Sequence, residues 1–140
     1  MHALVVDDFD SFRATLIGML QSLGVANVDS SATSAEALRL CSARAYDIIL
    51  CDQNLGKGKT GQQMLEVLRS APNLNSDSLF VLISAESNKS IIMAAYDCEP
   101  DGYLAKPITA QALAQRLNRL LVQRLALAPI YKSLKQSDVA

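Results

Sequence analysis

Aromatic residues are scarce in this sequence, tryptophan is absent, and only three cysteines occur among 140 residues. A core must therefore consist mainly of Leu, Ile, Val and Ala, and half of the chain is hydrophobic. The cysteines, Cys41, Cys51 and Cys98, are odd in number and show no C-x-x-C spacing. This pattern argues against a disulfide framework or a cysteine zinc site and fits a reducing cytoplasm.

Net charge is also small, at −1, so no overall cationic field favours nucleic acid or an anionic membrane as a partner. No apolar run approaches the roughly 20 residues of a membrane-spanning helix. The N-terminus lacks the basic region and cleavage site of a signal peptide. We therefore expect one globular, cytoplasmic domain without a membrane segment.

Short apolar runs alternate with segments of helical periodicity along the chain. Four residues, Ile48 to Cys51, are continuously apolar, as in a strand that is buried on both faces of a parallel sheet. Further strands are predicted at 2–6, 25–31, 79–83 and 102–105, and helices at 11–23, 34–44, 62–70, 88–96 and 109–128. Five alternating pairs require parallel crossover connections, which places helices on both faces of one sheet.

Polar side chains stand where four of these strands end. They are Asp7 and Asp8, Asp52, Ser84, and Lys106. One polar residue at a strand end is ordinary, because the chain emerges into water there. Parallel strands, however, bring all of them to the same edge of the sheet, where ligands bind in open α/β folds.

Three neighbouring carboxylates repel one another and suit a hard divalent cation, for which Mg²⁺ is the expected ion. Zinc is disfavoured, because the only histidine, His2, begins a strand instead of ending one. Lys106 and Ser84 supply donors suited to phosphoryl oxygens. Such a group of residues would let one carboxylate attack phosphorus while the cations stabilise the developing charge.

The sequence resembles the receiver domain of two-component response regulators over residues 1 to about 125. The resemblance rests on Val5-Val-Asp-Asp8, Asp52-x-Asn54, Ser84-Ala85 and Tyr103-Leu-Ala-Lys-Pro107. It implies that Asp52 accepts a phosphoryl group from the phosphohistidine of a sensor histidine kinase or phosphotransfer protein. Asp8 would ligate Mg²⁺ directly, Asp7 mainly through water, and Asn54 through its backbone carbonyl.

The same resemblance implies roles for the ends of the last two strands. Lys106 would contact the phosphoryl group, and a cis peptide to Pro107 would place it. Ser84 and Tyr103 would form a switch pair, in which the hydroxyl moves toward the phosphate and the ring turns inward. From the residues alone, the preferred interpretation of Tyr103 is an ordinary half-buried strand aromatic.

The loop after Asp52 departs from the family pattern, because residues 53–61 contain no proline and one extra residue. Within it, Gly56 to Gly61 matches G-x-G-x-x-G, the dinucleotide fingerprint. A P-loop would need glycine at Gln53, and an acidic strand end would repel a pyrophosphate. We interpret these glycines as turn residues of an Ω-like loop. Glu99-Pro100 also departs from the family pattern, before the last strand.

We expect a doubly wound, flavodoxin-like (βα)5 domain of strand order 2-1-3-4-5 over residues 1–127. Pro129 is expected to end the last helix, so that 128–140 forms a tail or the start of a linker or helical-repeat extension. Downstream partners would be a separate protein or a fused output domain, and leucines at 109–128 allow a homodimer. The domain is expected to be no enzyme beyond self-phosphorylation and slow autodephosphorylation.

Three alternative functions stay open from the sequence. One is a Mg²⁺-dependent phosphotransferase or phosphatase that forms an aspartyl-phosphate. A second is a receiver-like interaction module that acts without phosphorylation. A third is a flavodoxin-like cofactor protein, which shares the strand order and would show bound flavin.

Overall fold

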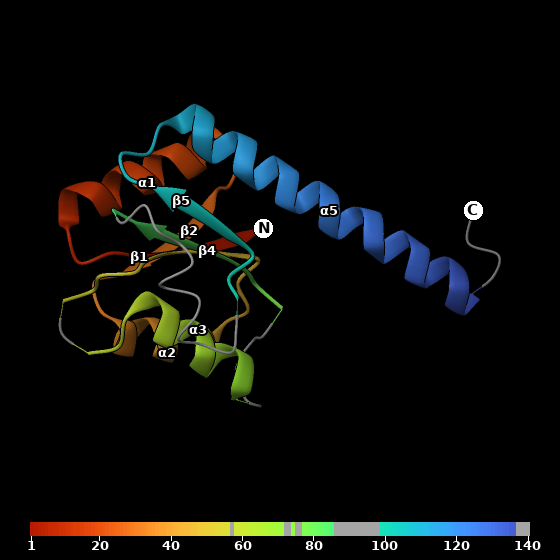
Figure 1. The fold of residues 1–140 in the computed structure, drawn as a ribbon, viewed down its shortest axis with the longest axis horizontal. Helices are drawn as coiled ribbons and strands as arrows, with labels where there is room; N and C mark the ends of the chain where they lie inside the picture. The colour runs from red at the N-terminus through yellow and green to blue at the C-terminus, as the bar shows by residue number, and fades with distance from the viewer. Residues whose placement is uncertain (57, 72–73, 75–76, 86–98, 137–140) are drawn as a thin grey trace. The chain divides into compact units, whose positions relative to one another are not determined.

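A computed structural model describes residues 1–56, 58–71, 74, 77–85 and 99–136, and the backbone alone over 125–136. The chain divides into two units, Met1–Ile108 and Thr109–Ala140. Among the described residues, the first unit holds the sheet and three helices, and the second holds one long helix (Figure 1). The helix that the sequence predicts at 88–96 lies outside the described residues.

Five parallel strands form one sheet in the order β2-β1-β3-β4-β5, which confirms the predicted flavodoxin-like topology. The strands are β1 (His2–Val6), β2 (Asn27–Ser31), β3 (Ile48–Asp52), β4 (Leu79–Ser84) and β5 (Gly102–Ala105). The chain leaves β1 for the edge strand β2 and returns past β1 to β3, so the order reverses between β1 and β3. That reversal is where open α/β sheets hold their ligands.

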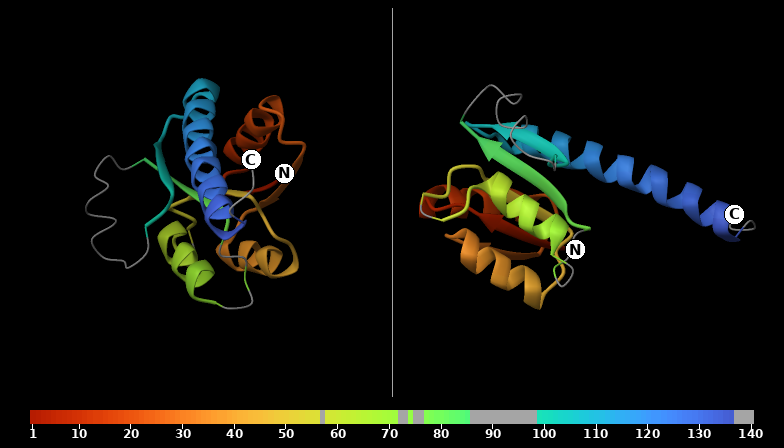
Figure 2. Two further views of the ribbon diagram at one scale, coloured as in Figure 1. Left: turned by 90° about the vertical axis from the view of Figure 1, so that its right-hand side faces the viewer. Right: turned by 60° about the horizontal axis from the view of Figure 1, so that its bottom comes forward.

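Three helices of the first unit flank the sheet on two sides. Helix α1 (Asp10–Ser22) lies on one face, and α2 (Ser34–Ala43) and α3 (Gly61–Ser70) lie on the other (Figures 1 and 2). Thr33 is the N-cap of α2, where its side chain accepts a hydrogen bond from Glu36 N. After α1, Gly24 adopts a φ of 98°, a left-handed conformation that glycine takes without strain at a helix end.

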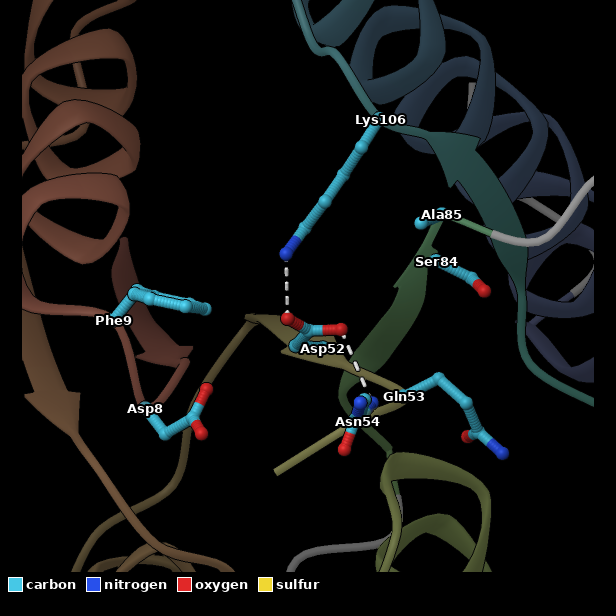
Figure 3. Close-up of a pocket in the computed structure, with 8 residues that line it drawn as sticks. All are labelled: Asp8, Phe9, Asp52, Gln53, Asn54, Ser84, Ala85 and Lys106. Carbon is cyan, nitrogen blue, oxygen red and sulfur yellow. Dashed lines mark hydrogen bonds and ion pairs between the residues drawn. The ribbon is translucent and has the colours of Figure 1, made fainter. Parts of the chain in front are cut away.

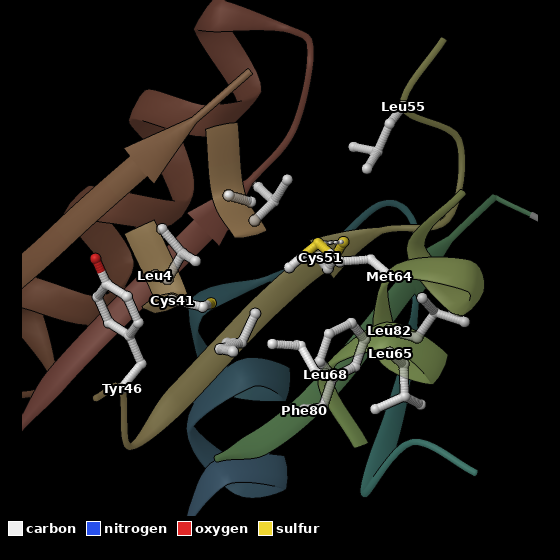
Figure 4. Packing of buried hydrophobic residues seen from close by; sticks show 13 residues of the cluster. Leu4, Cys41, Tyr46, Cys51, Leu55, Met64, Leu65, Leu68, Phe80 and Leu82 are labelled. Carbon is white, nitrogen blue, oxygen red and sulfur yellow. Dashed lines mark hydrogen bonds between the residues drawn. The ribbon is translucent and has the colours of Figure 1, made fainter. Parts of the chain in front are cut away.

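Aliphatic side chains pack between the sheet and the helices α2 and α3 (Figure 4). Alternate residues of the central strands point to this layer, because successive strand side chains face opposite sides of a sheet. The cluster includes Leu4, Val6, Cys41, Ile49, Cys51, Met64, Leu65, Leu68, Phe80 and Leu82. Cys41 and Cys51 are buried free thiols.

Helix α5 (Ala110–Gln136) is longer than the sequence predicts. We expected Pro129 to end it, and that prediction is wrong, because the helix continues for seven residues beyond Pro129. The fixed φ of proline is compatible with a helix, so its cost is a missing hydrogen bond and local crowding, which need not stop the helix. Of the residues that the structure describes, none belongs to a helix long and apolar enough to cross a membrane.

Candidate functional site

The polar strand ends meet at the carboxyl edge of the sheet. Asp7 follows β1, Asp52 and Ser84 end β3 and β4, and Lys106 follows β5. A pocket of about 330 Å³ opens at this edge (Figure 3). Its lining residues are Asp8, Phe9, Asp52, Gln53, Asn54, Ser84, Ala85 and Lys106. The parallel topology therefore brings together residues that are up to 98 positions apart between Asp8 and Lys106.

Three carboxylates form the acidic part of the site. Asp7 is fully buried, Asp52 is 4% exposed, and Asp8 is exposed to solvent. One oxygen from each of the three lies within 4.8 Å of the others. The pKa of Asp7 is raised to about 6, mainly by burial and also by the charge of Asp52, while the hydrogen bond from the Phe9 N–H and the charge of Lys106 act to lower it. The cluster is electrostatically unfavourable when it stands without a cation.

Backbone N–H groups fix the two buried carboxylates in the same way. Phe9 N donates to Asp7 Oδ1 at 2.8 Å, and Asn54 N donates to Asp52 Oδ1 at 3.1 Å. In both cases an aspartate at a strand end accepts from the residue two positions later, which is the Asx-turn geometry that this side chain favours. The second oxygen of each carboxylate is left to face the site.

Lys106 provides the cation of the site. Its Nζ donates to Asp52 Oδ2 at 2.7 Å and lies 3.7 Å from Asp7 Oδ2 (Figure 3). Burial lowers the pKa of Lys106, but the hydrogen bond to Asp52 and the nearby carboxylates outweigh this effect, so the pKa is raised. The ammonium therefore stays charged at neutral pH. The Lys106–Pro107 peptide bond is cis, and Lys106 N donates to Ser84 O at 3.0 Å.

The donor set fits a hard divalent cation. Asp7 Oδ2 is buried and accepts no hydrogen bond from the residues that the structure describes. An oxygen of this kind, beside two further carboxylates, matches the ligands that Mg²⁺ prefers. The thiol of Cys51 is fully buried nearby, and burial raises its pKa well above the usual value, so it offers no thiolate to a softer metal.

Ser84 and Asn54 also line the pocket, whereas Tyr103 does not. In the view of Figure 3 the hydroxyl of Ser84 points away from the Asp52 carboxylate. Tyr103 is half-buried on β5 and packs against the hydrophobic cluster of the α2 and α3 face. Burial, followed by the charge of Glu99, raises the pKa of the Tyr103 phenol, which stays protonated at neutral pH.

Sequence reasoning missed Gln53, which joins the phosphoacceptor candidate to helix α3. Its backbone oxygen accepts from Gly61 N at 3.0 Å, and its side-chain Oε1 accepts from Gln62 N at 2.9 Å. Its own N–H donates to Ile83 O at 2.8 Å. One residue thus accepts from the first two N–H groups of α3 and connects β3 to β4. A glutamine beside an aspartate gives no sequence signal of this role.

The glycines of the 56–61 loop have two different physical roles. Gly56 and Gly58 adopt φ values of 73° and 87°, which agrees with their interpretation as turn residues. Gly61 is instead the first residue of α3, where a Cβ atom would stand 2.6 Å from the backbone oxygen of Asp52. Thr60 caps the helix through a reciprocal capping box with Gln63. Neither role involves a bound nucleotide.

Comparison with known sequences connects this geometry with one family. The family model of the response regulator receiver domain matches residues 3–118. The chain is 28% identical over 120 residues to the chemotaxis protein CheY of Pseudomonas aeruginosa, an alignment that covers 86% of this chain and 95% of that protein. Chemotaxis protein CheY-3 of Vibrio cholerae is also 28% identical, with 86% and 91% covered.

Solved structures give the same result. A CheY-like receiver domain from Methylobacillus flagellatus aligns with a TM-score of 0.71 and 27% identity, covering 86% of this chain and 98% of that one. The N-terminal domain of a response regulator/sensory box/GGDEF three-domain protein from Carboxydothermus hydrogenoformans aligns with a TM-score of 0.77 and 25% identity. That alignment covers 93% of this chain and 99% of the other.

Proposed function

This chain belongs to the response regulator receiver family, and from that premise we propose that Asp52 is the phosphoacceptor of a two-component signalling pathway. The supporting observation is the position of its carboxylate. Asp52 lies at the pocket, with one oxygen held by Asn54 N and the other by the Lys106 ammonium. A carboxylate fixed in this way is oriented for attack on a phosphorus atom that enters the pocket.

In the proposed reaction, an oxygen of Asp52 forms a bond to phosphorus as the P–N bond to the imidazole of a phosphohistidine breaks. The electron pair of that bond leaves with the imidazole nitrogen. The donor would be a sensor histidine kinase or a phosphotransfer protein. Lys106 then transfers its hydrogen bond from the carboxylate to a phosphoryl oxygen and stabilises the charge there. Ser84 would donate its hydroxyl to another phosphoryl oxygen.

Asp7, Asp8 and Asp52, with the backbone carbonyl of Asn54, would hold Mg²⁺ at the site. The bound ion would offset the repulsion among the carboxylates and neutralise charge on the phosphoryl oxygens. The buried Asp7 Oδ2, which accepts no hydrogen bond from the described residues, would gain a partner in this ion. The chain's own contribution is to hold the carboxylates oriented and close together.

Phosphorylation would act as a switch and not as a catalytic cycle. Ser84 would move toward the phosphoryl group and Tyr103 would turn inward, shifting a two-state equilibrium on the face that includes residues 84–128. The output would be a downstream protein, a fused output domain or a homodimer. Residues 128–140 would then be a tail, a linker or the start of a helical extension to the 1–127 receiver.

Acetyl phosphate in Mg²⁺ tests the proposal. Intact-mass measurement should show one added phosphoryl group, which hydroxylamine removes as expected for an acyl phosphate. Asp52→Asn should abolish the labelling, because an amide is a poor nucleophile. Glu36→Gln is the matched control, since Glu36 is an exposed carboxylate of α2 outside the pocket lining, and this variant should label normally. Full labelling of Asp52→Asn would disprove the site assignment.

A further inference from the structure

The Lys106 ammonium has a second neighbour besides the carboxylates. Its Nζ lies over the ring of Phe12, 4.5 Å from the ring centroid. The same nitrogen donates to Asp52 Oδ2 at 2.7 Å (Figure 3). Phe12 is half-buried in the first turn of α1 and was not among the site residues that the sequence suggests. The ammonium thus contacts an aromatic face and the phosphoacceptor candidate at the same time.

We infer that Phe12 is a positioning residue for Lys106, holding its ammonium beside Asp52 through the face of the aromatic ring. The inference rests on the proposed function, because it concerns the same phosphoryl-transfer site. It goes beyond that function by assigning a role to a residue outside the carboxylate and switch positions. Phe12 itself is not among the residues that line the pocket.

An aromatic face suits this task for a physical reason. The ring attracts a cation through its quadrupole when the cation lies within about 6 Å of the centroid. It provides no strong acceptor, so the three N–H donors of the ammonium stay available to oxygen atoms. Lys106 can therefore release Asp52 and bind a phosphoryl oxygen without leaving the ring. A carboxylate in the place of Phe12 would instead compete with the phosphoryl group for those donors.

The surroundings strengthen the attraction. The Lys106 side chain is only 25% exposed, so water screens the contact incompletely. The neighbouring residues of α1 also act on this edge of the sheet. Arg13 Nη1 donates to Asp7 O at 2.7 Å, and Phe9 N donates to the Asp7 carboxylate. The N-cap and the first turn of α1 therefore contact both Asp7 and the ammonium of Lys106.

The long, flexible stem of a lysine makes such a support important. Without a fixed neighbour, the side chain would sample several rotamers, few of which place Nζ at Asp52. Phe12→Leu keeps an apolar side chain in the first turn but removes the aromatic face. We expect it to slow the labelling of Asp52 by acetyl phosphate about fivefold, as a cation–π contact of ordinary strength predicts. Phe12→Tyr keeps the ring and should recover most of the lost rate.

Two measurements separate positioning from a general effect on folding. In wild type the ring current of Phe12 should shift the ε-methylene protons of Lys106 upfield in the NMR spectrum. The shift should vanish in Phe12→Leu and return in Phe12→Tyr. In urea unfolding without Mg²⁺, Phe12→Leu combined with Lys106→Met should destabilise by less than the sum of the two single variants, because each removes the same contact.

The inference is overturned if Phe12→Leu labels at the wild-type rate, if Lys106 shows no ring-current shift, or if the two substitutions are additive in unfolding. None of these outcomes affects the phosphoacceptor assignment, which depends on Asp52→Asn. Conversely, labelling that survives in Asp52→Asn disproves the proposed function, while the ring-current and unfolding results still test the Phe12–Lys106 contact by themselves.

Discussion

Replacing Asp7 by Asn should stabilise the protein in the absence of a divalent cation, although Asp7 is proposed to be essential for binding that cation. Burial is the main reason that the pKa of Asp7 rises from 3.8 to about 6. The difference corresponds to about 3 kcal/mol of free energy of unfolding lost at neutral pH. An asparagine oxygen can still accept from Phe9 N, so most of this loss should be recovered in the variant.

The sign of the pH dependence follows from proton linkage. The folded protein binds the Asp7 proton more tightly than the unfolded chain, so this group lowers stability as pH rises from about 4 to about 6. Above that range the loss is complete, and below it the carboxyl is neutral in both states. The free energy of unfolding of Asp7→Asn should therefore exceed that of the wild type by about 2–3 kcal/mol at neutral pH and by almost nothing near pH 4.

Urea denaturation followed by circular dichroism, with EDTA present, measures this difference at the two pH values. Asp8→Asn is the matched comparison, because Asp8 belongs to the same cluster but is exposed to solvent, and it should gain less. Saturating Mg²⁺ should stabilise the wild type more than Asp7→Asn, since ligand binding to the folded state adds stability. An equal gain for Asp7→Asn at both pH values, or no gain at neutral pH, would refute the reasoning.

Two further predictions concern the connection between Asp52 and α3. Gly61→Ala should lower the free energy of unfolding by about 1–3 kcal/mol and slow the labelling of Asp52, because the new Cβ would stand 2.6 Å from Asp52 O. Gly18→Ala is the control, because Gly18 is an exposed helix residue whose Cβ would meet nothing within 4 Å, and this variant should be slightly more stable than wild type. Gln53→Leu should lower the free energy of unfolding, measured by urea denaturation, by about 1–3 kcal/mol, because the buried Gln62 N–H loses its acceptor. Gln53→Glu keeps an acceptor oxygen and should recover most of that stability. A larger loss for Gly18→Ala than for Gly61→Ala, or equal stability of the two Gln53 variants, would contradict these assignments.

Much of the fold could be predicted because its signals are local. The unbroken apolar runs that became β1, β3 and β4 can only be buried on both faces, and helical periods between them force parallel connections. The convergence of Asp7, Asp52 and Lys106 then follows from topology alone, because parallel strands end at one edge. Thr33 and Gly24 are likewise local signals, since capping depends on a few neighbouring residues.

The end of the last helix could not be predicted in the same way. Proline at position 129 is a strong local signal, yet α5 continues through it to Gln136. A proline removes one hydrogen bond and crowds the preceding turn, and a helix with enough residues on both sides can retain its other bonds. Whether the helix ends at a proline or continues past it depends on the interactions of the whole helix, and a single residue does not reveal them.

The contacts that were missed at the site join segments of the chain that only the folded structure brings together. Phe12 and Lys106 are both ordinary in their local contexts, and nothing in either segment indicates that a ring would lie 4.5 Å from the ammonium. Gln53 looks like a loop residue until α3 is placed beside it. The polar groups at strand ends were found because they share one edge, whereas the contacts of Phe12 and Gln53 each involve a helix, α1 or α3, whose position against the sheet the sequence does not specify.

These missed contacts share a physical consequence. Asp52 is held by Lys106, which Phe12 contacts on α1, and its neighbour Gln53 is bonded to α3. Helices on opposite faces of the sheet therefore both act on the candidate phosphoacceptor (Figure 2). In the proposed reaction Lys106 would turn to a phosphoryl oxygen and give up its hydrogen bond to Asp52, whereas the bonds from Gln53 to α3 involve no group of that reaction.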